Sequence, residues 1–368
     1  MRPIPDSGSR SCSGDVWGGD EMPGAYSENA ITAKVKAMYG KRLTPEDYNQ
    51  LLQKKSVGEI AAYLKHETIY GGVLREIKED LIHRGQLENL VRRHAVEIYS
   101  KLLGYSFRDR FFPTIYTARK EIEQLLAAMR MLNSGSMNRF ILDFPPYLDK
   151  YMSFDLFSLA RIASFDDLLE VVRGSEYYRL LGPHRPVSAA GQIDIMACET
   201  TLLINYYRKA FKLLDRYDAG TREDLAAILR VQIDLHNLTV IYRLKRFYND
   251  SKDGIVPHLI PIKTRVSHRI YNNLVDAPDT AAMYKGLEGV RMLRRYFKED
   301  TTEDIGYVIE CLRQHTSRKI FRFSTRPVVA VLSYMTLMEM EEDNVVNIIE
   351  GIRYALPPDE IRKLLILS

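Results

Sequence analysis

The sequence predicts an all-α protein made of three similar helical units packed around a pseudo-threefold axis. Apolar residues recur every three or four positions along most of the chain, and helix-start signals are frequent. Strand patterns are scarce, because the only candidate, residues 255–262, contains two prolines that disfavour a strand. Two unrelated sequence markers each occur three times at a common spacing, and this predicts the internal repetition.

Length and composition are those of a globular protein with a sizeable core. A chain of 368 residues has room for two or three domains or for one repeated fold, and 46% of it is hydrophobic. The formal net charge of +4 is too small to indicate nucleic acid as the main partner. Three widely separated cysteines match no metal-ligand spacing, and we expect reduced thiols in a cytoplasmic protein.

The segments in chain order begin with a stretch that has no periodicity. Residues 1–24 are rich in Ser, Gly, Pro and Asp, and we expect a disordered tail there, with Met22 as a candidate later translation start. No signal peptide is visible, because the N-terminus lacks an apolar core segment. The three units are assigned to residues 25–135, 136–249 and 250–368.

Each unit is expected to join a short helical cluster to a pair of long helices that form an antiparallel hairpin. Five segments place a hydroxyl at a helix N-cap with a carboxylate three residues later: Thr44–Asp47, Ser56–Glu59, Ser164–Asp167, Thr221–Asp224 and Thr301–Asp304. The long pairs are expected at 84–103 with 115–133, 192–215 with 222–249, and 304–322 with 327–354. The longest uncharged apolar run, 328–338, spans eleven residues, short of the ~20 needed to cross a bilayer, so we expect a buried helix.

The repeats are defined by two motifs. The segment starting at Ser56 aligns with segments starting at Ser164 and Asp276, at separations of 108 and 112 residues. A second motif begins with an acid, and its copies follow one another at separations of 113 and 107 residues; the acids are Glu121, Asp234 and Glu341. Agreement between the two spacings predicts units of about 110 residues, with a hole on the axis or, alternatively, a linear solenoid.

Catalytic, cofactor-binding and metal-binding residues are not indicated. The eight histidines form no ligand pair at helical spacing, no Gly-rich phosphate loop is present, and no cysteine or serine lies in a nucleophile motif. We therefore expect no catalytic site, no cofactor and no metal. The three motif acids are interpreted as helix-face carboxylates with solvent or a nearby base as partner.

Positive charge is concentrated in the third unit. Residues 281–326 contain ten Lys or Arg against six Asp or Glu. Two interpretations remain open at this point: a solvated basic face, or a surface for an anionic partner or headgroup.

Two ends of the chain resemble one protein family. The closing segment Asp343–Ile361 resembles the C-terminal signature of the C or d subunit of V-type and A-type rotary ATPases. The opening segment 26–74 resembles the N-terminal unit of the same family through Ala33-x-x-x-Ala37-x-Tyr39-Gly40, Leu43-Thr-Pro-Glu-Asp-Tyr48 and Thr68-Ile-Tyr-Gly71. The resemblance covers residues 25–368 and is diffuse in the middle.

The resemblance implies a non-catalytic coupling protein. The family fold is a helical funnel with a central cavity, peripheral to the membrane on its cytoplasmic face. Its implied partners are the D and F proteins of the central stalk and the proteolipid rotor ring, and its role is to transmit torque for H+ or Na+ transport or ATP synthesis. We expect Arg291, Arg294 and Arg295, together with Arg353, to lie on these contact surfaces, ordinary surface ion pairing being the alternative.

Two other functional classes stay open on sequence grounds. A helical adaptor could bind nucleic acid through a basic groove, which steep salt dependence of binding would reveal. An enzyme would be indicated by a metal or cofactor that co-purifies with the protein.

Overall fold

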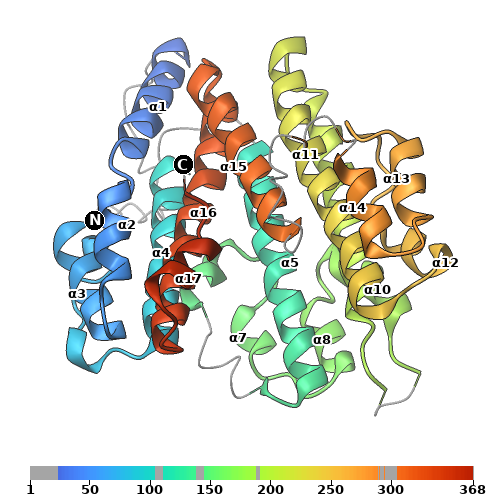
Figure 1. The fold of residues 1–368 in the computed structure, drawn as a ribbon, viewed down its shortest axis with the longest axis horizontal. Coiled ribbons are helices and arrows are strands. Elements are labelled where there is room, and N and C mark those ends of the chain that lie inside the picture. Colours follow the sequence, from blue (N-terminus) through green and yellow to red (C-terminus); the bar gives the residue numbers. More distant parts are fainter. Residues whose placement is uncertain are drawn as a thin grey trace, which may run out of the picture.

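The computed structural model describes residues 24–103, 111–137, 145–187, 191–288, 290, 294 and 305–367. Over these ranges the protein is all-helical and contains no β-strand, so the predicted fold class is confirmed (Figure 1). All of the predicted tail except Gly24 lies outside the described residues, as does the predicted cap at Thr301.

Long helices form the body of the molecule. Six of them are α4 (Arg84–Leu103), α5 (Phe111–Ser134), α10 (Ile195–Leu214), α11 (Ala219–Arg243), α15 (Ile305–Phe323) and α16 (Pro327–Arg353). Shorter helices are α1 (Gly24–Tyr39), α2 (Pro45–Leu52), α3 (Val57–Glu67), α7 (Leu156–Leu159), α8 (Phe165–Val171), α9 (Glu176–Leu181), α12 (Lys252–Ile255), α13 (His268–Val275), α14 (Thr280–Glu288) and α17 (Pro358–Leu364). Each predicted long helix is present within a few residues of its expected bounds.

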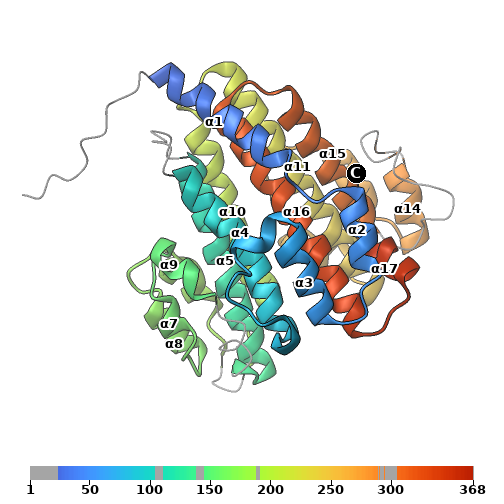
Figure 2. The same ribbon diagram turned by 90° about the vertical axis from the view of Figure 1, so that its left-hand side faces the viewer.

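The long helices pack side by side, with α16 in the middle of the network. α16 contacts α15, α4, α1, α11 and α5, while α5 packs along α10 and α11 along α15 (Figures 1 and 2). Of the three expected antiparallel helix pairs, α15 and α16 pack against each other most extensively. α4 and α5 find their main partners in α16 and α10 instead, and they touch each other where Tyr99 stacks on Tyr116, with ring centroids 4.1 Å apart.

Helix starts follow the predicted chemistry at three positions. Thr44 and Ser164 form complete capping boxes, and Ser56 caps α3 by accepting a hydrogen bond from the Glu59 amide. The predicted cap at Thr221 is wrong. Asp218 caps α11 instead, because a carboxylate three residues earlier accepts the amides of the first turn.

The apolar run 328–338 lies in the first half of α16, where most of its side chains are buried. Its partners are other helices of the same chain, which confirms the expected buried helix. No helix in the described part of the chain combines the length and hydrophobicity that a membrane span requires. The segment 255–262, the only strand candidate, begins at the last residue of α12 and continues into a short 3-10 helix, Val256–His258.

The three motif acids do not lie on solvent-facing helix surfaces, so their interpretation as surface carboxylates is wrong. Glu121, Asp234 and Glu341 are 5%, 0% and 7% exposed. Each carboxylate accepts hydrogen bonds from one or two backbone amides and from one tyrosine hydroxyl of a short helical cluster. The donors are Ser153 N and Tyr177 Oη for Glu121; Arg265 N, Val266 N and Tyr271 Oη for Asp234; and Leu43 N and Tyr70 Oη for Glu341.

Asparagines make a second set of connections. Asn344 Oδ1 accepts the Ile366 amide at 2.9 Å and its Nδ2 donates to the Ile366 carbonyl at 3.0 Å. Asn237, also three residues after a motif acid, makes the same pair of bonds to Ile260 at 2.8 and 3.2 Å. Each asparagine side chain thus hydrogen-bonds both the backbone amide and the backbone carbonyl of one loop residue, and this fixes the loop to a long helix.

The first short cluster belongs with the end of the chain. Residues of α2 and α3, including Leu51 and Ile60, share one apolar core with Ile348 of α16 and Ile361 of α17. Figure 2 shows α2 and α3 beside α17 and the lower part of α16. The remaining described core residues divide between a large central cluster and a smaller one around α13, α14 and the second half of α11.

Candidate functional site

A charged cavity lies where α4, α5, α15 and α16 meet. Its volume is about 420 Å³. Ionisable side chains of both signs line it: Glu88, Arg92, Arg119, Lys120, Glu123, Arg313, Glu339, Glu342 and Asp343. The helices that carry these side chains are amphipathic, and each charged residue lies beside the apolar stripe of its helix.

Ion pairs hold the inner wall of this cavity. Lys120 of α5 lies 3.0 Å from Glu123 and 3.3 Å from Glu339 of α16, and Arg313 of α15 lies 3.4 Å from Glu339. Burial opposes ionisation of Glu339, but Lys120 and Arg119 outweigh it and lower the pKa of this carboxyl to about 2. The cluster therefore stays charged at neutral pH and joins three long helices.

Glu342 lies one helical turn from Glu339 and has the opposite character. It is 3% exposed and accepts the Ala95 amide of α4 at 2.9 Å. Burial raises the pKa of Glu342 well above its ordinary value, and the neighbouring Glu339 charge adds to this effect. One face of α16 therefore presents an ionised carboxylate next to one whose ionisation is disfavoured.

The cavity opens at a pair of half-exposed side chains. Arg92 of α4 and Asp343 of α16 lie 3.4 Å apart, and the side chains are 50% and 51% exposed. Such an exposed pair stabilises the fold by ~0–1 kcal/mol, so both groups remain free to meet a partner.

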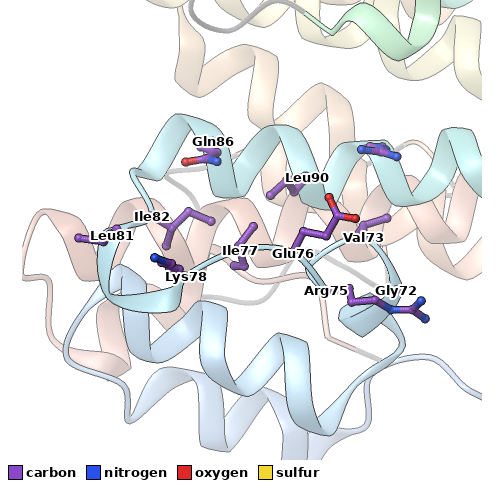
Figure 3. Close-up of a pocket in the computed structure, with 11 residues that line it drawn as sticks. Gly72, Val73, Arg75, Glu76, Ile77, Lys78, Leu81, Ile82, Gln86 and Leu90 are labelled. Atoms are coloured by element: carbon purple, nitrogen blue, oxygen red, sulfur yellow. The ribbon is translucent and has the colours of Figure 1, made fainter.

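A second hollow lies between α4 and residues 72–82 and has a volume of about 520 Å³ (Figure 3). Ile77, Ile82 and Leu90 occupy its middle, while Lys78 and Arg75 lie toward opposite ends. Its lining also includes Arg93 of α4 and one acid, Glu76.

The predicted interaction residues are only partly visible. Arg291 and Arg295 lie outside the described residues, and Arg294 is exposed. Arg353 is 47% exposed at the end of α16 and lies 3.9 Å from Glu350, and it does not line the charged cavity. Arg294 does not line this cavity either.

Sequence reasoning missed the cavity residues Lys120, Arg313 and Glu339. One signal was present, since Glu339 and Glu342 follow an apolar run on a helix predicted to be buried. A buried acid needs a partner, but the identity of that partner depends on which helices meet. The arrangement has no nucleophile and base in hydrogen-bond contact; its charged groups can instead pair with those of another protein.

Comparisons with known proteins agree with the fold. A family model described as "ATP synthase (C/AC39) subunit" matches residues 31–364. The chain is similar to the C subunit of the A-type ATP synthase of Archaeoglobus fulgidus, 24% identical over 360 residues that cover 96% of this chain and 98% of the relative. It is also similar to the corresponding A-type ATP synthase protein of Thermococcus kodakarensis, 23% identical over 339 residues that cover 90% and 88% of the two chains.

Proposed function

Because the chain belongs to the ATP synthase (C/AC39) subunit family, and is thus a non-catalytic part of a rotary ATPase, we propose that it is the socket between stalk and rotor ring. In this role it receives the D and F proteins of the central stalk, stands on the proteolipid ring at the cytoplasmic face of the membrane, and transmits torque for H+ or Na+ transport. The nucleic-acid adaptor finds no support in the comparisons.

The observation that carries the proposal is the charged cavity between α4, α5, α15 and α16. A shaft that turns together with its socket must be held against slipping, and charge pairs fix register more effectively than an apolar contact does. The inner ion pairs remain charged at neutral pH, and the outer pair of Arg92 and Asp343 is half exposed. Both signs are therefore offered to an incoming stalk.

Stiffness of the body supports the same role. α16 is buried along most of its length and contacts α1, α4, α5, α11 and α15, among other helices, so a force on one helix is passed to the whole body. The three buried acids fix each short cluster to a long helix. These contacts support our proposal of three similar units arranged as a funnel, in which the first cluster completes the unit of α16.

We place a second contact surface at the basic segment of the third unit. Arg294 is exposed there, and Arg291 and Arg295 belong to the same run of sequence. Charge reversal at these three positions is expected to weaken association with the ring or the stalk, measured by co-purification. Arg353→Glu is expected to act at a separate surface, and unchanged association in all of these variants would remove the arginines from the interface.

A charge swap tests the cavity. Arg92→Glu is expected to weaken capture of the stalk proteins by the immobilised chain, because it places two acids together at the cavity mouth. The double variant Arg92→Glu/Asp343→Arg restores the internal pair but reverses the pattern shown to a partner.

The double variant is the matched control. Loss of capture in both variants, with unchanged thermal stability, supports a partner contact. Full recovery of capture in the double variant would mean that the pair serves only the fold of the chain itself.

A further inference from the structure

A separate pocket of about 210 Å³ lies on another side of α16, between the α1–α2 connection, α15 and the C-terminal segment. Three arginines line it, each from a different part of the chain. Arg42 follows α1, Arg318 belongs to α15, and Arg362 belongs to α17. The coupling role uses none of them.

Two of these arginines are held in place by neutral groups. The Arg42 guanidinium lies 4.1 Å from the centroid of the Tyr39 ring and donates to the Tyr39 carbonyl at 3.2 Å. Arg362 donates to Asn49 Oδ1 at 2.6 Å. Fixing a guanidinium in this way reduces the entropy that it would lose on binding an anion.

The charge of the three arginines is not balanced by ion pairs. In the described part of the chain, none of Arg42, Arg318 and Arg362 has a carboxylate at ion-pair distance. Other arginines of the same region are paired, as Arg313 is with Glu310 and Glu339. Over the described residues, the pocket therefore collects three guanidinium groups that have no ion-paired carboxylate, and Arg42 has only the longer-range attraction of the buried Glu341.

Glu341, the acid in the lining of the pocket, does not form an ion pair with these arginines. Glu341 is 7% exposed, and its two oxygens already accept hydrogen bonds from the Leu43 amide and the Tyr70 hydroxyl. Burial also raises the pKa of Glu341 to about 7, so its charge is only partial near neutral pH. An anion in the pocket would face an excess of positive charge.

We propose that this pocket binds a phosphate group, carried by inorganic phosphate or by a nucleotide. Arginines from three parts of the chain offer several N–H donors to the oxygens of a tetrahedral oxyanion, each of which accepts charge-assisted hydrogen bonds. The size of the pocket accommodates one or two phosphate groups, and the inference is independent of the coupling role.

Calorimetric titration of the full chain tests the proposal. Inorganic phosphate and ADP without metal are titrated separately at constant ionic strength, with chloride as the reference anion. Binding of phosphate or ADP with one site per chain is expected. Tighter binding of ADP would identify a nucleotide as the source of the phosphate group, and equal or tighter binding of inorganic phosphate would identify the free anion.

Variants connect the binding to this pocket. Arg318→Gln and Arg362→Gln are each expected to weaken binding about tenfold, the loss of one charge-assisted contact. Arg318→Lys keeps the charge and is expected to lose less. Arg222→Gln on α11 removes one exposed arginine elsewhere and serves as the matched control. No binding by the wild type, or equal weakening by Arg222→Gln and Arg318→Gln, would overturn the proposal.

Discussion

Replacing Asn344 by alanine should release the C-terminal segment from α16. The Asn344 side chain is 4% exposed and makes two hydrogen bonds to the backbone of Ile366, at 2.9 and 3.0 Å. Ile366 is itself 9% exposed, so its amide would have no solvent partner near at hand, while its carbonyl would keep the bond from Gln314 Nε2 at 2.9 Å. At about 1 kcal/mol for each net hydrogen bond, the segment should lose about 2 kcal/mol of local stability.

Hydrogen exchange at the Ile366 amide measures this loss directly. A change of about 2 kcal/mol corresponds to exchange that is roughly thirtyfold faster. Asn347→Ala, one turn away, is the control, because its bond to the Leu364 carbonyl is exposed and 3.4 Å long. The reasoning fails if exchange at Ile366 is unchanged in Asn344→Ala, or if Asn347→Ala has the same effect.

Three further predictions concern α16. Burial raises the pKa of Glu341 from 4.5 to about 7, so the folded state binds the carboxyl proton more tightly than the unfolded state does. The free energy of unfolding should therefore fall as pH rises from 4.5 to 7. Glu341→Gln should flatten this pH dependence, measured by urea unfolding. The pKa of Glu339 is lowered to about 2 despite its burial, so the ionised carboxylate stabilises the fold above pH 4.5, and this stabilisation is lost as pH falls toward 2. Glu339→Gln should make the free energy of unfolding less sensitive to acid. Gly351→Ala should destabilise the fold by ~1–3 kcal/mol and lower the urea midpoint, because a Cβ there would lie 2.6 Å from Cγ1 of buried Ile361. An unchanged midpoint would mean that α17 shifts freely.

Features that depend on neighbours in sequence could be predicted. Helix bounds and the caps at Thr44 and Ser164 follow from local periodicity and local hydrogen bonding. The cap of α11 was misplaced because Thr221 and Asp218 both offer side-chain oxygens, and only the observed backbone path selects Asp218.

Features that depend on distant contacts could not be predicted. Glu341 accepts a hydrogen bond from the Leu43 amide, which is 298 positions away in the sequence, and no local pattern predicts such a contact. An acid on an amphipathic helix normally faces solvent, so the burial of the three motif acids becomes visible only once the short clusters are placed against the long helices. Their common spacing was nevertheless recognised, because repetition is a property of the sequence itself.

The charged cavity shows the same limit. Lys120 lies on α5, far in the sequence from Arg313 and Glu339 on the consecutive helices α15 and α16, and each charge alone resembles an ordinary surface charge. Composition indicated a modest local excess of positive charge but not the paired acids that neutralise it. The stalk proteins that we propose for this cavity are implied by the family resemblance, and no physical argument from the residues alone names them.

The central claim is that this chain bridges the central stalk and the rotor ring. The direct measurement is capture of the purified D and F stalk proteins on an immobilised, detergent-solubilised proteolipid ring, with and without the chain. We expect the stalk proteins to be retained only when the chain is present, and to be retained less by Arg92→Glu. Equal retention without the chain, or a chain that binds neither the stalk nor the ring, would contradict the account.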